Sequence, residues 1–428
     1  MRRAWIAMLL LAWPAMLLAE QRFPAPEFKT DYQIPPLEAP PAHAIAWQYV
    51  DLAVLTAALG VAAWLVHKRR WRRGVFALTI FSLLYFGFWR KGCVCSIGAL
   101  QNVALAATDS TYALPWVVAG FFVLPLLFAL FYGRVFCAGV CPLGAIQDLV
   151  LWKPVQVPPW LEHSLSLFAY MFLGLGVLLA TAGGEFAICR YDPFVGFFRL
   201  SAPGQMVFLG ALLLAVGMFV GRPYCRFICP YSVPLKLLSM FSRRRVTISP
   251  ADCIDCRLCE ISCPFGAIRY PAPPRTHNES SPRRHAALAA VLLPVLVGVF
   301  ALVGYATSNA MSRVDFTVRL AERVRLEETG AVRDATDEST AFRNTGQSVA
   351  QLYAQAASVQ RRFAIGTPIF GAWIGLAIGG KLLAIALRRR HIGYTAEPGA
   401  CVACARCFTT CPVEHERRKV QRPETILA

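Results

Sequence analysis

The chain has 428 residues, of which 56% are hydrophobic and only 16% are charged. Its apolar residues occur in long blocks, a composition that is typical of integral membrane proteins and excludes an ordinary soluble domain. A formal net charge of +18 would suggest a nucleic-acid ligand in a soluble protein. Here the basic residues cluster at the ends of apolar segments, so we expect membrane lipid as the partner and no nucleic acid.

Residues 1–19 combine two arginines with an apolar stretch that ends at Ala19. This pattern indicates a signal peptide, with an uncleaved anchor helix as the alternative. Residue 20 is external in both cases. The proline-rich stretch 20–48 is too short for a domain, so we expect it to be an extended external segment.

Apolar stretches close to the roughly 20 residues that cross a bilayer predict an all-α polytopic protein with about seven transmembrane helices. The predicted spans lie at 49–66, 74–89, 115–132, 164–182, 204–220, 286–306 and 364–387. If they alternate in direction, the basic clusters fall on one side, which the positive-inside rule marks as the cytoplasm. These clusters lie at 67–73, 242–245, 282–285 and 388–391. Arg90 and Lys91 are the exception, because they fall on the outer side.

The remaining boundaries follow from these spans. In chain order we expect a five-helix membrane core at 49–245, the first half of a cytoplasmic module at 246–285, a transmembrane helix at 286–306, an external loop at 307–363, a transmembrane helix at 364–387 and the second half of the module at 388–428. Within the external loop, the alternating stretch 314–320 indicates a docking strand, a short amphipathic segment or a solvated loop.

Two cysteine runs share the spacing C-x2-C-x2-C-x3-C-P: "CIDCRLCEISCP" at 253–264 and "CVACARCFTTCP" at 401–412. This is the ligand spacing of bacterial ferredoxins, in which the fourth cysteine ligates the other cluster. Two predicted spans separate the runs, so both return to one face, and we predict a split ferredoxin-like module with two [4Fe-4S] clusters. The predicted ligand sets are Cys253, Cys256, Cys259 and Cys411 for one cluster, and Cys401, Cys404, Cys407 and Cys263 for the other.

Two alternatives to this ligand arrangement stay open. Each run could complete a cluster of its own without exchanging the fourth cysteine. Each run could instead be a zinc knuckle, although zinc sites prefer two pairs of cysteines to a 2-2-3 spacing. Disulfides are not expected at a cytoplasmic face.

Two further segments carry the pattern C-x3-C-P, "FCAGVCP" at 136–142 and "YCRFICP" at 224–230, each with a Gly-Arg pair nearby. Both follow an inward-running span. Four thiolates at one membrane face favour a third iron–sulfur cluster, with Cys137, Cys141, Cys225 and Cys229 as ligands. The alternative is four small buried hydrophobic residues, since free cysteine packs well in a core.

The hairpins of the membrane core are predicted to be repeated. "CSIGALQNVAL" at 95–105 resembles "CPLGAIQDLVL" at 141–151, although the two segments fall on opposite sides of the membrane. This indicates an inverted repeat with the working site at the repeat interface. Cys93, Cys95 and Cys189 are predicted to be external, where they could cap a cluster, meet a partner's cofactor or be spare thiols.

Other chemistries are not supported. Haem b would need histidines inside the spans, but His67, His163, His285 and His391 lie at the predicted cytoplasmic ends. Ion pumping would need carboxylates inside the membrane, and the spans contain almost none. No catalytic residue is predicted, since iron–sulfur clusters do one-electron chemistry and need no substrate pocket.

The C-x3-C-P pairs, "RPYCRFICP" (222–230) among them, together with "CIDCRLCEISCPFGAI" (253–268), resemble the NosR/NapH-type membrane polyferredoxins, including similar proteins of organohalide respiration. The resemblance covers residues 49–270 and, by spacing, the C-terminal cysteine run. It implies a bacterial inner-membrane protein that passes electrons between the quinone pool, or a cytoplasmic donor, and an extracytoplasmic reductase or flavoprotein. The NosR branch carries a large FMN-binding domain where this chain has 20–48, so FMN is expected only through a partner.

We therefore expect a membrane protein that conducts electrons as a component of an oxidoreductase. A quinol dehydrogenase-like role is one form that this could take. Assembly or maturation of a periplasmic metalloenzyme, or redox sensing, are the alternatives. A hydrocarbon core of about 30 Å is too thick for one efficient electron hop, so an intermediate carrier is also expected.

Overall fold

The computed structural model describes residues 45–92, 95–200, 203–248, 252–269, 282–387 and 393–420. The predicted signal peptide, most of the segment 20–48, and Cys93 lie outside these ranges. The described residues form helices and one two-stranded sheet. The predicted helical class is therefore confirmed.

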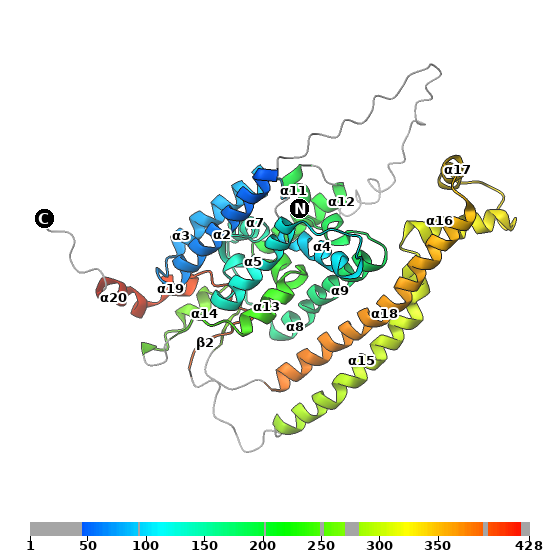
Figure 1. Ribbon diagram of the computed structural model, residues 1–428. Helices are drawn as coiled ribbons and strands as arrows, with labels where there is room; N and C mark the ends of the chain where they lie inside the picture. The colour runs from blue at the N-terminus through cyan, green and yellow to red at the C-terminus, as the bar shows by residue number, and fades with distance from the viewer. Residues whose placement is uncertain are drawn as a thin grey trace, which may run out of the picture. The chain divides into compact units, whose positions relative to one another are not determined.

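The membrane core, residues 45–245, is a set of helices joined by short turns (Figure 1). Its elements are α2 (Ile45–His67), α3 (Arg72–Ser82), the π-helical η1 (Leu83–Trp89), α4 (Ser96–Thr108), α5 (Trp116–Tyr132), α6 (Val135–Gly139), α7 (Pro142–Val150), α8 (Pro159–Leu165), α9 (Leu167–Ala182), α10 (Ala187–Arg190), α11 (Val195–Arg199), α12 (Gly204–Gly217), the π-helical η2 (Tyr224–Ile228) and α13 (Ser232–Met240).

Four helical stretches in the described part of the chain are long and apolar enough to cross a membrane: Ala46–His67, Pro159–Ala182, Arg284–Ser312 and Val349–Ala386. They account for the spans predicted at 49–66, 164–182, 286–306 and 364–387. The shorter apolar helices α5 and α12 lie in the spans predicted at 115–132 and 204–220.

The segment predicted as a span at 74–89 is not one uniform helix. Its backbone changes from α-helix to π-helix at Leu83. The wider turns lie where the ring of Phe198 packs over Gly87, whose ideal Cβ would stand 2.9 Å from that ring. Single π-helical turns inside α-helices often mark functional sites.

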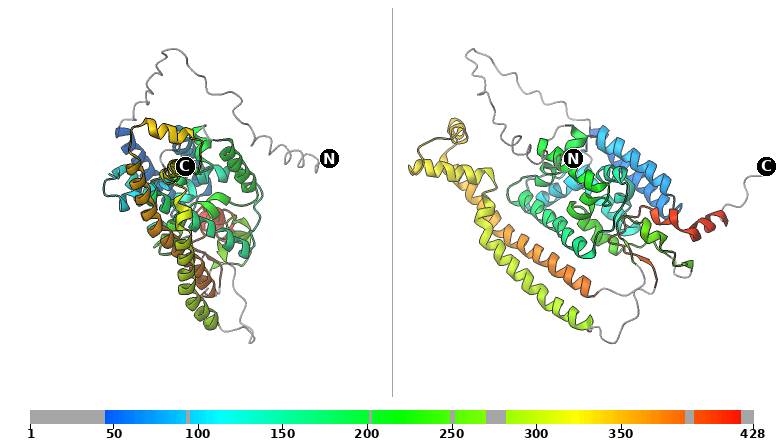
Figure 2. Two further views of the ribbon diagram at one scale, coloured as in Figure 1. Left: turned by 90° about the vertical axis from the view of Figure 1, so that its right-hand side faces the viewer. Right: turned by 180° about the vertical axis from the view of Figure 1, so that it is seen from behind.

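Helices α15 (Pro282–Ser312) and α18 (Val349–Ala386) run side by side in both views (Figures 1 and 2). Small residues make the closest contacts. An ideal Cβ on Gly375 would lie 2.5 Å from the carbonyl oxygen of Leu296, and Gly371 meets the backbone of Phe300 in the same way. Glycines four residues apart let the two backbones touch, as they do in membrane helix pairs. The outer face of α15 exposes apolar side chains suited to lipid, including Leu288, Val291, Val295, Val299 and Leu302.

Residues 307–363 are not the predicted loop. Helix α15 continues to Ser312, α16 (Phe316–Glu328) and α17 (Asp337–Asn344) follow, and α18 begins at Val349. The docking-strand reading of 314–320 is wrong, because Asp315 caps α16 by accepting a hydrogen bond from the backbone N–H of Thr317 at 2.8 Å. Seven residues of alternation are too few to separate a strand from a helix.

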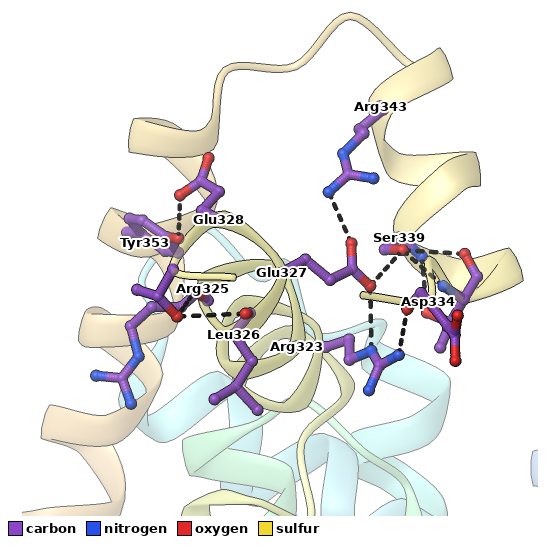
Figure 3. A network of polar contacts seen from close by, with 11 residues as sticks. Arg323, Arg325, Leu326, Glu327, Glu328, Asp334, Ser339, Arg343 and Tyr353 are labelled. Atoms are coloured by element: carbon purple, nitrogen blue, oxygen red, sulfur yellow. Dashed lines mark hydrogen bonds and ion pairs between the residues drawn. The ribbon is translucent and has the colours of Figure 1, made fainter. Parts of the chain in front are cut away.

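Helices α16 and α17 form a cap over the start of α18. Its apolar core consists of Val318, Leu320, Ala321, Val324, Phe342, Leu352 and Ala356. Figure 3 shows Glu327 at the centre of its polar contacts. This carboxylate accepts hydrogen bonds from Arg323 at 3.1 Å, Arg343 at 2.6 Å and Ser339 at 2.9 Å.

The exception to the positive-inside pattern has a local partner. Arg90, which follows η1, forms an ion pair of 2.6 Å with Asp51 in the first turns of α2. The hydroxyl of Tyr85 also donates to Asp51, at 3.0 Å. Asp51 is 1% exposed, and its carboxylate neutralises the charge of Arg90, one of the two basic residues at the predicted outer end.

Candidate iron-sulfur sites

Both ferredoxin-type cysteine runs have the same backbone conformation. Asp255 and Arg257 have left-handed φ angles of 53° and 59°, and the equivalent Ala403 and Ala405 have 53° and 61°. Non-glycine residues adopt this conformation at an energetic cost and do so mainly at functional sites. Such turns direct successive backbone N–H groups to one side, which makes a concavity suited to an anion.

After these turns, each run forms one short helix, and the fourth cysteine is the residue that follows it. The first run forms α14 (Leu258–Ser262), which Cys263 follows, and the second forms α19 (Arg406–Thr410), which Cys411 follows. A proline follows in both, and in the second run it begins α20 (Pro412–Val420). Proline is tolerated there, because a first-turn N–H has no partner inside the helix.

The two runs lie against each other although about 150 residues of sequence separate them. The hydroxyl of Thr410 in α19 is 3.1 Å from that of Ser262 in α14. Strand β1 (Ile268–Arg269) pairs with β2 (Thr395–Ala396) in antiparallel register, with Ile268 opposite Ala396. An ion pair between Arg269 and Glu397 closes the same edge. The structure therefore brings the two halves of the predicted module together.

The eight cysteines of the two runs line two cavities. The first is lined by Cys253, Cys256, Cys259 and Cys411, together with Cys407. The second is lined by Cys263, Cys401, Cys404 and Cys407. Each cavity thus receives cysteines from both runs, and each contains one of the predicted exchanged sets.

The donor chemistry of these cavities suits iron–sulfur clusters, which are held by cysteine thiolates. Among the described residues no three cysteine, histidine or acidic side chains converge on one point as they would around a lone metal ion. Instead the sulfurs surround a space. Burial raises the pKa of Cys401 to about 12 and that of Cys407 well above its ordinary value, with neighbouring thiols adding to the rise. These sulfurs are therefore protonated without metal, and metal binding must release their protons.

A buried carboxylate docks the second run on the membrane core. Asp148, near the end of α7, forms ion pairs with Arg72 at 2.5 Å, Arg406 at 3.0 Å and Arg222 at 3.5 Å. Its side chain is fully buried, and the three guanidinium groups hold its pKa below the usual range against the effect of burial. Because Arg406 precedes Cys407 directly, this contact fixes the second cysteine loop.

The first run is docked by a different surface. The side-chain amide of Gln156 donates a hydrogen bond of 2.9 Å to the carbonyl oxygen of Cys263. An ideal Cβ on Gly221 would lie 2.6 Å from the carbonyl oxygen of Pro264, so only glycine allows this approach. Both cysteine loops are thus part of one unit with the membrane core.

The two C-x3-C-P segments also meet. Cys137 in α6 and Cys225 in η2 line one cavity. Cys141 and Cys229 are buried in the hydrophobic core against which Cys137 and Cys225 pack. The structure therefore brings the four predicted ligands of a third cluster, from two hairpins, into one region of the core. Phe265 and Val402 of the ferredoxin module line this cavity as well as that of Cys263 and Cys401.

Arginines surround the C-x3-C-P cysteines. Arg134 and Arg222, the arginines of the two Gly-Arg pairs, are 7% and 1% exposed. A terminal nitrogen of Arg134 lies 3.7 Å from the sulfur of Cys137, and Arg222 donates to the carbonyl oxygen of Cys137. The Nε atoms of both arginines lack a hydrogen-bond partner among the described residues. Buried cations of this kind fit a group with net negative charge, as a thiolate-ligated cluster has.

The predicted outer cysteines are closer to this site than the sequence indicates. Cys95 and Cys141, which the sequence places on opposite sides of the membrane, line one cavity together. Cys189 lies beside Cys95, next to Gly98. Cys93 is outside the described residues.

Sequence reasoning missed Asp148 and the two buried glutamines Gln101 and Gln147. A signal was present for each. Asp148 is the only charged residue between Val135 and Leu151, and an isolated charge in an apolar segment indicates a functional position. The glutamines occupy the same place in the two repeated sequences.

Comparison with known proteins gives a consistent result. A family described as "4Fe-4S binding domain" matches residues 114–162 and 203–249, and a second of the same description matches 246–269. Protein NirI of Paracoccus denitrificans is 30% identical over 46% of this chain and 31% of its own length. Putative electron transport protein YccM of Escherichia coli is 26% identical over 39% of this chain and 52% of its own. Regulatory protein NosR of Stutzerimonas stutzeri is 26% identical over 54% of this chain and 34% of its own.

This chain therefore spans about half or less of the length of these three relatives. No solved structure matches it. The matched residues include both C-x3-C-P segments and the first ferredoxin-type run.

Proposed function

We propose that this chain is a NosR/NapH-type membrane polyferredoxin, because it matches two families described as 4Fe-4S binding domain and is similar to NirI, YccM, MauN and NosR. In this role it is a multi-pass electron carrier that links the quinone pool, or a cytoplasmic donor, to an extracytoplasmic reductase or flavoprotein. Its ferredoxin module would hold two [4Fe-4S] clusters and face the cytoplasm of a bacterial inner membrane. FMN, if it takes part, would belong to the partner.

The observation that carries this proposal is the mixing of the two cysteine runs. One cavity combines Cys253, Cys256 and Cys259 with Cys411, and the other combines Cys401, Cys404 and Cys407 with Cys263. With Cys407, which lines both cavities, assigned to the second, each cavity has four thiols, the ligand number and type of a [4Fe-4S] cluster. Exchange of the fourth cysteine also explains why the two halves of the module precede and follow the helices α15 to α18 in the sequence.

The path of the electrons follows from the order of the sites. The ferredoxin cavity of Cys263 and Cys401 adjoins the cavity of Cys137 and Cys225 through Phe265 and Val402. Cys141 then adjoins Cys95. A third cluster ligated by Cys137, Cys141, Cys225 and Cys229 would place a carrier between the module and the predicted outer cysteines. Iron–sulfur clusters supply one-electron transfer at each position, and the protein supplies spacing and docking.

The proposed topology has seven spans, with α3–η1, α5 and α12 crossing in addition to the four long helices. The basic clusters at 67–73 and 242–245 would face the cytoplasm. The Asp51–Arg90 ion pair is compatible with this orientation, because it neutralises one of the two basic residues, Arg90 and Lys91, that follow the second span on the outer side.

Two measurements test the proposal. Protein purified without oxygen should contain about eight iron atoms for the two ferredoxin clusters and about twelve with the third. Sealed vesicles carrying the protein should oxidise a quinol and reduce a membrane-impermeant acceptor on the predicted outer side. Replacement of Cys404 by serine should abolish this transfer, whereas Asp252→Asn in the same module should not. Iron clearly below about eight atoms, or transfer that survives Cys404→Ser, would refute the proposal.

A second candidate is redox control or maturation of a respiratory metalloenzyme. It is favoured by the name of one relative, Regulatory protein NosR of Stutzerimonas stutzeri. In this case iron would be bound, but quinol oxidation by the vesicles would stay at the background rate. The iron content and the vesicle assay together separate the two functions.

A further inference from the structure

The repeated sequences of the membrane core have the same local structure. Cys95 is the residue that precedes α4, and Cys141 is the residue that precedes α7. In both helices a glycine follows three residues after the cysteine and a glutamine follows six residues after it. Gln101 and Gln147 are both fully buried.

Each glutamine holds a second cysteine segment. The side chain of Gln147 donates to the sulfur of Cys225 at 3.2 Å, and its oxygen accepts from the backbone N–H of Tyr224 at 3.0 Å. The side-chain oxygen of Gln101 accepts from the backbone N–H of Cys189 at 3.3 Å. The position of Cys189 relative to Cys95 in one repeat therefore corresponds to the position of Cys225 relative to Cys141 in the other. The pair Cys95 and Cys189 is thus the counterpart, in the first repeat, of the C-x3-C-P site.

The counterpart places two sulfurs around one small space. An ideal Cβ on Gly98 would lie 2.9 Å from the sulfur of Cys189 and 4.0 Å from that of Cys95. Both sulfurs are thus within 4.0 Å of one point, and only a glycine leaves that point empty. Cys95 is partly buried, whereas Cys189 is exposed.

We propose that Cys95 and Cys189 form a redox-active dithiol–disulfide couple, the counterpart of the C-x3-C-P site, which closes across the space left by Gly98. A disulfide needs a sulfur–sulfur distance of about 2.05 Å, so closure requires the two side chains to rotate into that space. The exposed sulfur of Cys189 is the one that an external thiol–disulfide protein reaches, and Cys95 is the partner that resolves the mixed disulfide.

The chemistry balances by exchange with the external thiol–disulfide protein. Closing the Cys95–Cys189 disulfide forms one S–S bond and breaks the S–S bond of that protein, whose two sulfurs take up the two protons and two electrons. Opening the disulfide with a dithiol form of the external protein is the reverse reaction. Formation of the couple does not depend on the proposed function.

A dithiol fits the surroundings better than a metal ion. Among the described residues no group of three cysteine, histidine or acidic side chains is placed to hold a metal ion. The carboxylate of Asp192 accepts hydrogen bonds from the hydroxyl of Tyr224 at 2.7 Å and from the backbone N–H of Phe194 at 2.9 Å. Two thiols alone support dithiol–disulfide chemistry.

The test is thiol counting on the full chain in membranes, with Cys93 replaced by serine so that it cannot compete. The protein is oxidised with diamide or reduced with dithiothreitol, denatured in an alkylating agent and digested for mass spectrometry. We expect the peptides of Cys95 and Cys189 to lose alkylation together on oxidation and to appear as one cross-linked peptide. In Cys189→Ser, Cys95 should stay alkylated under both conditions.

A glycine pair provides the matched control. Gly98→Ala adds a Cβ between the sulfurs and should slow disulfide formation at least tenfold, although both thiols remain. Gly60→Ala, in α2, meets nothing within 4 Å and should leave the rate unchanged. Alkylation of both cysteines after oxidation would overturn the proposal.

Iron measured on the same samples keeps the two proposals distinct. Loss of iron in Cys189→Ser with unchanged alkylation would show that the pair ligates metal and would also overturn the couple. Low iron in every sample, with the cross-linked peptide present, would count against the proposed function alone.

Discussion

Replacing Asp148 by asparagine should release the second cysteine loop from the membrane core. The carboxylate is fully buried and pairs with Arg72, Arg222 and Arg406 at 2.5, 3.5 and 3.0 Å. Asparagine keeps the size of the side chain but removes the charge. Three guanidinium groups then lose their shared anion, and Arg222, 1% exposed, cannot move to water.

The expected magnitude follows from burial. Breaking a buried ion pair by removing one partner costs about 3–5 kcal/mol. If most of this cost falls on docking of α19, the docking equilibrium shifts by roughly two to three powers of ten, since each 1.4 kcal/mol is a factor of ten. The matched control is Asp252→Asn in the same module. Its ion pair with Arg417 is 44% and 43% exposed, and such pairs contribute at most about 1 kcal/mol.

Hydrogen exchange of residues 403–411 measures this shift, and the iron content measures its consequence. We expect exchange to accelerate by at least a hundredfold in Asp148→Asn and by less than tenfold in Asp252→Asn. Iron should fall by about four atoms in Asp148→Asn only. Equal exchange rates and equal iron in the two variants would refute the argument that Asp148 docks the loop.

Three further predictions concern other parts of the chain. Gly375→Val should destabilise the α15–α18 hairpin by about 1–3 kcal/mol, as measured by thermal unfolding, because the added side chain overpacks against Leu296. Gly380→Val should change the stability little, because a Cβ on Gly380 meets nothing within 4 Å. Equal effects of the two substitutions would contradict the backbone contact. Burial opposes ionisation of Glu327, but hydrogen bonds from Ser339 and two arginines outweigh it and lower its pKa. The cap should therefore be stable above the ordinary glutamate pKa and loosen as the pH falls through the lowered pKa of Glu327, which faster proteolysis at 329–348 would show. Glu327→Gln should remove this pH dependence. An unchanged pH profile in Glu327→Gln would contradict the role of Glu327. Cys411→Ser should remove about four iron atoms, not eight, and unchanged iron would exclude it as a ligand.

The cysteine chemistry was predictable because it is encoded locally. The spacing C-x2-C-x2-C-x3-C-P dictates a tight loop followed by one helical turn, and both runs have this conformation. Long apolar segments likewise predicted the long helices, since length and composition alone set them. Where a prediction depended on a few residues, as at 314–320, the packing of α16 against α17 and α18 decided the outcome instead.

Contacts between distant segments had no local signal. The pairing of Asp148 with Arg406 joins positions 258 residues apart, and spacing within either segment does not reveal it. That Cys95 and Cys141 line one cavity was not predicted from the sequence, for another reason. Assigning each segment to one side of the membrane assumes that helices begin at its surface, whereas α4 and α7 begin at a shared cavity.

A cryo-EM map of the protein purified without oxygen would test the central claim most directly. We predict two iron–sulfur cubes side by side in the module. One should be bonded to Cys253, Cys256, Cys259 and Cys411, and the other to Cys401, Cys404, Cys407 and Cys263. A map in which each cube is bonded to four cysteines of a single run, or in which the two runs hold no common structure, would contradict it.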